Sequence, residues 1–170
     1  MIGVKMIHHV NVQISDRQRT REWYEQVLGA EFLDRGPLNE RQLQLRIGTG
    51  EMHFTETSEP VATGHFAVEV DNWDEMLANL ERLGIPYTRT PGVTHAGPLR
   101  TSEDTPYQGR REDNSEHYTY VRDPDGNVIE LVYHPLGLED VDGQRVELPD
   151  TSKPLRWKQK EGFVNAGPMR

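Results

Sequence analysis

The chain has 170 residues, a formal net charge of −9 and no cysteine, which suits one compact domain or two closely associated halves and excludes disulfides and thiolate metal sites. The acidic balance argues against nucleic acid as a partner, because neutralising phosphates requires clustered Lys and Arg, and no apolar run approaches the ~20 residues of a membrane span. With no signal-peptide pattern at the N-terminus, we expect a cytoplasmic protein that binds neither nucleic acid nor a membrane.

Two segments alternate apolar and polar residues as half-buried strands do, and each begins with a histidine. They are residues 9–14 and 65–70. In both segments the histidine falls on the polar side of the strand. A histidine at the same point of two matching strands suggests a duplicated unit, and neutral imidazole is the commonest metal ligand in proteins.

Each of these strands is followed by a predicted helix with a capping residue before it and a glycine after it. The helices are residues 17–28, capped by Asp16, and residues 73–83, capped by Asp71 or Asn72. The Leu-Gly pairs that end the helices are 55 residues apart, and the two histidines are 56 apart. This nearly constant offset predicts an internal repeat with two copies, where a solenoid would need at least three.

Strand-like segments follow each helix, three in each copy. In the first copy they are residues 31–35, 41–47 and 51–56, and in the second copy residues 85–90, 117–122 and 127–133. Glycine-rich or Asp-Pro turns, 48–50 and 123–126, join the last two strands of each copy. Each half therefore reads β-α-β-β-β. We predict an α+β fold with a first module over residues 1–60 and a second over residues 61–135.

Two segments lie outside the repeat. Residues 91–116 are an insertion in the second copy, rich in Pro, Gly, Ser, Thr and charge. A loop of that length is usually functional or disordered, so we expect a lid or rim over the site, or a contact with a partner subunit. Residues 136–170 form a C-terminal extension with many apolar residues. Because exposed apolar patches often mark contact surfaces, we expect a symmetric homodimer supported by this extension.

Sorting the predicted strands by face separates an apolar row, suited to packing beneath the helices, from a polar row. Four potential metal ligands take matching places in the polar row. His9 and His65 lie on the first strand of each copy, and His53 and Glu130 lie on the last. This symmetry predicts a metal site. The alternative interpretation is a polar face open to water, which antiparallel sheets often have.

Three stretches carry a family resemblance: IHHVNV at 7–12, WYEQVLG at 23–29 and DPDGNVIEL at 123–131. Together with the repeat, they resemble the vicinal oxygen chelate superfamily, which includes glyoxalase I, methylmalonyl-CoA epimerase, extradiol dioxygenases, and fosfomycin and bleomycin resistance proteins. The resemblance covers about residues 5–135. In that family, paired βαβββ modules form a cupped mixed sheet with helices on the outer face. The resemblance implies that His9, His65 and Glu130 are ligands of a divalent metal. His53 falls where several members place a fourth ligand.

The resemblance also implies a chemistry. A divalent ion (zinc, nickel, manganese or iron) would act as a Lewis acid on a small oxygen-rich substrate that it chelates through two neighbouring oxygens. Proton transfer needs an acid or base on the same face, and Glu51, Glu69 and Tyr120 are candidates. Glu130 itself is another, because the ligand glutamates of glyoxalase-like enzymes are thought to shuttle a proton. We therefore expect a metal-dependent lyase or isomerase of glyoxalase type.

Two other functions stay open. A metal-dependent extradiol-type dioxygenase would explain Tyr120, which lies three residues before the Asp-Pro turn, but His117 is too close to it and Thr119 replaces the usual apolar residue. A small-molecule binding or antibiotic-resistance protein without turnover would not need the ligand histidines, because drug-sequestering members lack them. The metal found in purified protein would separate these readings, with iron favouring oxygen chemistry and nickel, zinc or manganese favouring proton transfer.

Overall fold

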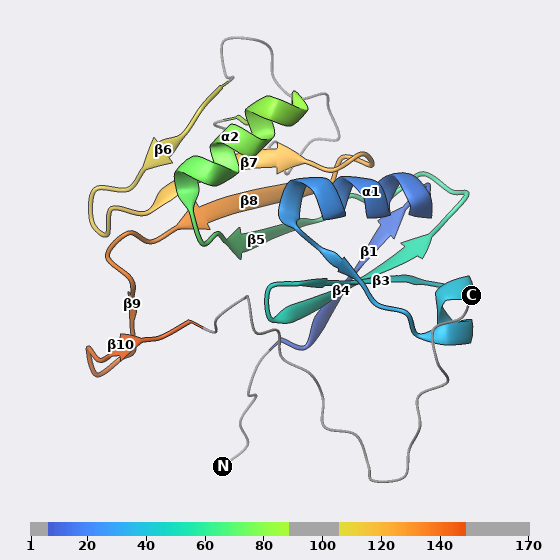
Figure 1. The fold of residues 1–170 in the computed structure, drawn as a ribbon, viewed down its shortest axis with the longest axis horizontal. Coiled ribbons are helices and arrows are strands. Elements are labelled where there is room, and N and C mark those ends of the chain that lie inside the picture. Colours follow the sequence, from blue (N-terminus) through green and yellow to red (C-terminus); the bar gives the residue numbers. More distant parts are fainter. Residues whose placement is uncertain (1–6, 89–105, 149–170) are drawn as a thin grey trace, which may run out of the picture. The chain divides into compact units, whose positions relative to one another are not determined.

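The computed structural model describes residues 7–88 and 106–148 (Figure 1). These residues form two compact units, the first ending at Val61 and the second running from Ala62 to Glu147. Each unit contains one α-helix and a four-stranded mixed sheet, so the predicted α+β fold is confirmed. Within the described ranges, no helix is long and apolar enough to cross a membrane.

The first unit follows the β-α-β-β-β order. Its elements are β1 (His9–Ile14), α1 (Arg17–Leu28), β2 (Glu31–Phe32), the short 3-10 helix η1 (Gly36–Glu40), β3 (Leu43–Ile47) and β4 (Gly50–Glu56). In the sheet the strands lie in the order β1-β4-β3-β2. The first and last strands, β1 and β4, pair in parallel, whereas β3 is antiparallel to both β2 and β4.

The second unit repeats this topology. Its elements are β5 (His65–Glu69), α2 (Trp73–Leu83), β6 (Gly109–Arg110), β7 (His117–Arg122) and β8 (Val128–Tyr133), followed by the hairpin β9 (Leu138–Glu139) and β10 (Arg145–Val146). The strand order β5-β8-β7-β6 matches that of the first unit, again with the first and last strands parallel. The same sequence pattern therefore produces the same sheet twice.

Most predicted strands agree with the structure to within two residues, whereas two differ more. The segment 31–35 is a strand only over Glu31–Phe32, followed by one backbone hydrogen bond of 3.0 Å from Leu33 to Gln44; the Asp34 side chain then accepts a hydrogen bond of 2.9 Å from the Gly36 N–H as the chain turns into η1. The segment 85–90 has a single bridge, from Thr88 to Tyr120, and its last two residues lie outside the described ranges. The fourth strand of this sheet is instead β6, which comes from the predicted insertion.

Both helices begin and end where the sequence predicts. The Asp16 side chain accepts a hydrogen bond from the Arg19 N–H at 2.8 Å and caps α1, and Asn72 caps α2 in the same way. The helices end at Gly29 and Gly84, with φ angles of 62° and 67°. This left-handed conformation costs glycine little, which explains why the two Leu-Gly pairs mark the helix ends.

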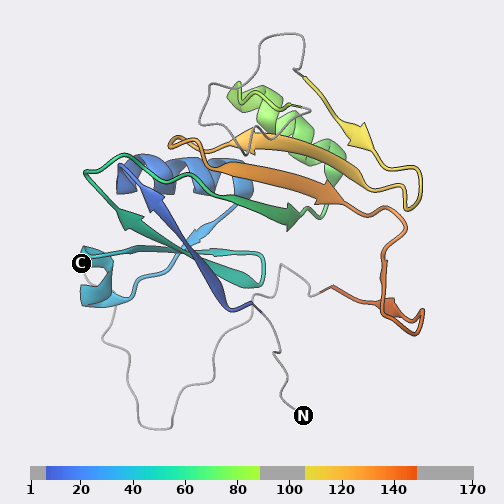
Figure 2. The same ribbon diagram turned by 180° about the vertical axis from the view of Figure 1, so that it is seen from behind.

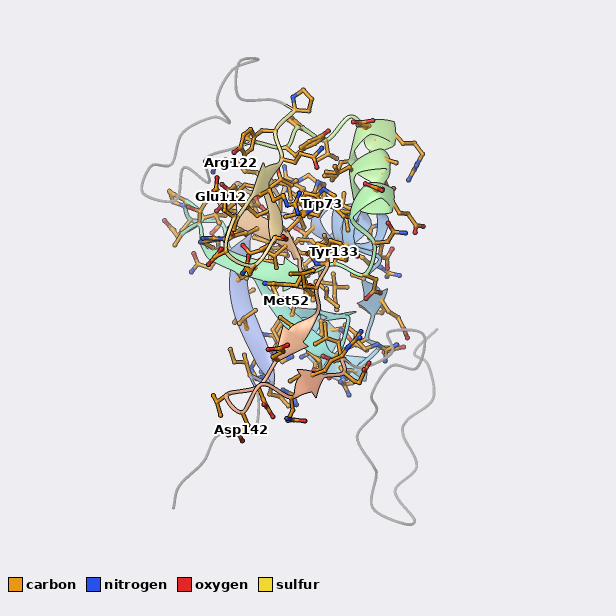
Figure 3. All side chains as sticks on the ribbon, turned by 90° about the vertical axis from the view of Figure 1, so that its left-hand side faces the viewer. Met52, Trp73, Glu112, Arg122, Tyr133 and Asp142 are labelled. Carbon is orange, nitrogen blue, oxygen red and sulfur yellow. The ribbon has the colours of Figure 1, made fainter. Side chains whose placement is uncertain are left out.

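Each helix packs on the apolar face of its own sheet. In the first unit the Tyr24 ring of α1 meets the Phe54 ring of β4 edge-on, with centroids 4.8 Å apart. In the second unit Trp73 of α2 meets His117 of β7, with centroids 5.5 Å apart, and α2 lies in front of β7 in Figure 1 and behind it in Figure 2. Figure 3 labels Trp73 and Tyr133, the two aromatic neighbours of His117. The polar residues of each sheet therefore point away from the helix of the same unit.

The Asp-Pro turn before β8 is held together by two side chains. The Asp123 carboxylate accepts hydrogen bonds from the backbone N–H groups of Asp125 and Asn127, both at 2.9 Å. The fully buried Asn127 side chain donates to Asp123 Oδ2 at 2.8 Å and accepts from the Gly64 N–H at 2.8 Å. Asn127 therefore joins the start of β8 to the residue before β5, and so helps to set the register between them.

We predict that Asn127→Ala destabilises the fold by about 3 kcal/mol, because each buried polar group left without its partner costs ~1–3 kcal/mol. The free energy of unfolding in urea measures the loss. Asn79→Ala is the matched control, since its amide contacts Arg82 at the exposed surface of α2, and it should change stability by less than about 0.5 kcal/mol. Equal losses for the two variants would contradict the structural role of Asn127.

Candidate metal centre

Parallel pairing places the candidate ligands of each unit on one face of its sheet. In the first unit His9 pairs with Glu51, and His53 lies two residues further along β4. In the second unit Glu130 stands in the same place relative to His65. Because side chains two residues apart on a strand share a face, each unit presents a first-strand and a last-strand candidate together.

The candidate pair of the first unit consists of two imidazoles. The rings of His9 and His53 are stacked, with centroids 4.0 Å apart and planes 13° apart. His9 Nδ1 lies 2.9 Å from His8 Nδ1, so one of these two nitrogens carries the shared hydrogen. His53 Nε2 lies 3.3 Å from Glu51 Oε2, and the other oxygen of Glu51 accepts a hydrogen bond of 2.8 Å from Arg35.

The surroundings favour a neutral His53 beside an ionised Glu51. Burial lowers the pKa of His53, and His9 acts in the same direction, whereas the hydrogen bond to Glu51 opposes the shift without cancelling it. Burial also raises the pKa of Glu51, but the hydrogen bond from His53 and the positive charge of Arg35 outweigh it, so the pKa lies below its ordinary value. Neutral imidazole is the form that binds a metal.

The candidate pair of the second unit combines an imidazole with a carboxylate. His65 Nε2 lies 3.5 Å from Glu130 Oε2. The Tyr120 hydroxyl donates to Glu130 Oε1 at 3.0 Å, and an Arg111 nitrogen lies 3.9 Å from the same oxygen. Burial, followed by the hydrogen bond to Glu130, raises the pKa of Tyr120 to about 12. At neutral pH Tyr120 is therefore a phenol that donates a hydrogen bond.

Glu69, the remaining candidate for proton transfer, has a different set of contacts. It accepts from the His134 backbone N–H at 2.9 Å, and His134 Nδ1 lies 2.8 Å from its other oxygen. The second ring nitrogen of His134 lies 3.0 Å from Glu116. Glu69 thus connects the end of β5 to the residue after β8. These contacts indicate a structural role for Glu69.

Two residues beside the candidate ligands did not emerge from the sequence. Arg35 precedes η1 and Arg111 follows β6, and each places a guanidinium group beside a carboxylate of the polar face. Arg35 ends the segment 31–35 that the sequence predicted as a strand, and Arg111 lies in the predicted insertion; neither is inside a strand or helix of the structure. No alternation or capping pattern in the sequence around these two arginines indicates that they contact the carboxylates.

The donors present suit a divalent ion. Imidazole and carboxylate groups together bind zinc, nickel, manganese and iron, and both kinds stand on the polar faces. Each unit by itself supplies a pair of donors. Within residues 7–88 and 106–148, no group of three or more His, Cys, Asp or Glu side chains is gathered as a metal site would require.

Comparison with known proteins assigns the family. Residues 6–131 match the family model of the Glyoxalase/Bleomycin resistance protein/Dioxygenase superfamily. The chain belongs to this superfamily. A curated superfamily relative, "Probable lactoylglutathione lyase" of Vibrio cholerae, is 24% identical over 150 residues, which cover 81% of this chain and 96% of the relative. The resemblance noted in the sequence is thereby confirmed.

Solved structures of superfamily members have the same fold. A putative glyoxalase family protein from Bacillus anthracis aligns with a TM-score of 0.60 and 21% identity, covering 79% of this chain and 98% of that one. Lactoylglutathione lyase from Agrobacterium tumefaciens aligns with a TM-score of 0.57 and 20% identity, covering 79% and 97%. At these identities the likeness shows the fold alone.

We predict that Tyr120 ionises only at high pH in metal-free protein. Its pKa of about 12 in the folded state exceeds the ordinary value of about 10, so the fold favours the neutral phenol. The stabilisation is complete below pH ~10 and is lost as the pH rises towards 12. Spectrophotometric titration should lose its highest-pH component in Tyr120→Phe, with circular dichroism reporting that the fold persists.

Glu130→Gln is the companion variant for this titration. It removes the negative charge that the Tyr120 hydroxyl faces, so the highest component should move to lower pH. If Tyr120→Phe instead removes a component near pH ~10, the ordinary value for tyrosine, the hydrogen bond between Tyr120 and Glu130 does not govern this phenol.

Proposed function

We propose that this protein is a divalent-metal-dependent enzyme of glyoxalase type, a lyase or isomerase, acting on a small oxygen-rich substrate. The repeated ligand pair carries the proposal. In a member of this superfamily, a first-strand histidine and a last-strand donor stand in the same register in both units. A polar face that merely contacted water would not require matching donors in both copies.

The ligands of the ion would be His9, His53, His65 and Glu130, the set that the family resemblance implies. Three neutral imidazoles and one carboxylate leave a divalent ion with a net positive charge. Bound there, the ion would act as a Lewis acid towards two neighbouring oxygens of the substrate. The distant relationship to a probable lactoylglutathione lyase supports a substrate with adjacent oxygen atoms.

The residues around Glu130 suit it to move a proton. Tyr120 donates to Oε1 and remains a phenol at neutral pH, since its pKa is about 12, so Tyr120 is a poor base. We assign to Tyr120 the role of holding the carboxylate in place. Glu130 Oε2, on the side of His65, is then the oxygen that takes a proton from the substrate and returns it.

Removing the ligands tests the metal site. His9→Ala, His65→Ala and Glu130→Ala should each weaken binding of zinc or nickel by more than about 100-fold, because loss of an outer-shell partner alone costs ~10–100-fold. His53→Ala should have a milder effect. His117→Ala is the matched control, since this histidine faces Trp73 on the helix side of β7. Competition with a chromogenic chelator measures the affinities.

The same titrations should show binding that weakens as the pH falls through the histidine range, because protonated imidazole cannot bind a metal. Equal metal content in the wild type and in the double variant His9→Ala/His65→Ala would overturn the site. An effect of His117→Ala as large as that of His65→Ala would show that the losses reflect damage to the sheet.

The reaction class is tested with the metal-loaded protein. Lactoylglutathione and other compounds with adjacent oxygen atoms should be converted when zinc, nickel or manganese is bound, with oxygen uptake recorded in parallel. Conversion without oxygen uptake supports a lyase or isomerase. Uptake that requires iron would identify a dioxygenase. Tight binding without conversion under any metal would identify a binding protein.

We also propose a homodimer supported by the C-terminal extension. Four apolar residues of its described part are exposed: Leu136 at 74%, Val141 at 101%, Val146 at 41% and Leu148 at 52%. Light scattering should give the mass of a dimer for the full-length chain and of a monomer for a truncation ending near Pro135. A monomer in both cases would refute the dimer, and a dimer in both would place the interface elsewhere.

A further inference from the structure

We infer that Glu51, held by Arg35, is a positioning residue for His53. Glu51 accepts the hydrogen on His53 Nε2 and thereby leaves Nδ1 as the nitrogen available to a metal. The tautomer follows from contacts within the first unit. Only its consequence for metal binding rests on the function proposed above.

The hydrogen-bond chemistry determines the tautomer. Glu51 Oε2 lies 3.3 Å from His53 Nε2, and an ionised carboxylate can only accept a hydrogen bond. The hydrogen between them must therefore come from Nε2. A neutral imidazole carries one ring hydrogen, so Nδ1 has a lone pair. Both side chains are largely shielded from solvent, with exposures of 13% for Glu51 and 14% for His53.

Arg35 fixes the carboxylate from the other side. Its guanidinium group donates to Glu51 Oε1 at 2.8 Å, and 38% of the Arg35 side chain is exposed. With Oε1 engaged by Arg35, Oε2 is the oxygen directed at His53. Arg35, Glu51 and His53 are therefore linked in series by hydrogen bonds. The series begins at the partly exposed guanidinium group and ends at a candidate ligand.

Comparison of the two units supports this assignment. Glu51 is the residue that pairs with His9 in the sheet, and its counterpart in the second unit, which pairs with His65, is Val128. Two residues further along the strand stand His53 and Glu130. An acceptor at one ring nitrogen fixes the tautomer of an imidazole ligand and so exposes the other nitrogen, whereas a carboxylate has no such tautomer to fix. The acidic neighbour is present in the unit whose last-strand candidate is a histidine.

This arrangement differs from the proton-transfer role that the sequence suggested for Glu51. Both of its oxygens already have partners that favour the carboxylate form. Metal-binding histidines commonly donate their other ring N–H to a carboxylate, which fixes the tautomer and the ring orientation. Glu51 fits that description through its contact with His53.

Nuclear magnetic resonance of metal-free protein labelled with ¹⁵N-histidine tests the tautomer directly. The His53 signals are assigned by their absence in His53→Ala. We expect the hydrogen on Nε2 in the wild type and a mixture of tautomers in Glu51→Gln, because an amide can both donate and accept. Glu56→Gln is the matched control. It lies on the same strand and loses a similar ion pair, with Arg17 at 3.0 Å, but the tautomer should not change.

Metal binding tests the consequence. In the wild type loaded with ¹¹³Cd, we expect scalar coupling between the metal and His53 Nδ1. Glu51→Gln should weaken zinc binding by about 10–100-fold, and Glu56→Gln should leave it unchanged.

Three results would overturn the inference: a hydrogen on Nδ1 in the metal-free wild type, cadmium coupling to Nε2, or an unchanged tautomer in Glu51→Gln. The wild-type measurements decide the matter even if a variant fails to fold. A wild type that binds neither zinc nor cadmium would contradict the proposed metal function, while the tautomer of the metal-free protein would still test the contact between Glu51 and His53.

Discussion

The structure depends on the parallel pairing of the first and last strands in each unit. This pairing brings together residues that are distant in sequence and places a histidine and a second donor on one face. A slip of one residue would turn every side chain of a strand to the opposite face, so that Glu130 would point towards α2. The register is therefore as important to the candidate site as the identity of the donors.

The two units share a frame and differ in electrostatic character. The first unit presents two stacked imidazoles beside an ionised carboxylate and a guanidinium group. The second presents an imidazole and a carboxylate, with a phenol that remains protonated. Both units have the same sheet topology, whereas the neighbours of each donor differ. The candidate donors of the two units thus occupy matching positions but have different neighbouring side chains, each suited to its donor.

Much of the fold and the donor positions could be predicted from local patterns. Asp16 and Gly29 mark the ends of α1, and the alternating segment 9–14 has the bounds of β1. Contacts made by irregular segments could not be predicted. Arg35 and Arg111 reach the polar faces from positions outside the observed strands and helices, and β6, with only two residues, still pairs with β7. Such contacts depend on the tertiary structure, because they join residues that are distant in sequence. Alternation and capping residues indicate only local structure.

The contact between Asn127 and Gly64 has a consequence for how this chain can vary. It ties β8 to the residue before β5, so the alignment of His65 with Glu130 does not depend on the length of chain between Thr88 and Gly109. The entropy cost of closing a loop rises slowly with its length, by about 0.6 kcal/mol for each doubling. Natural variation could therefore lengthen, shorten or rewrite that connection while the donor geometry is preserved. A change at Asn127, by contrast, would disturb that geometry, because its buried amide makes the contact with Gly64.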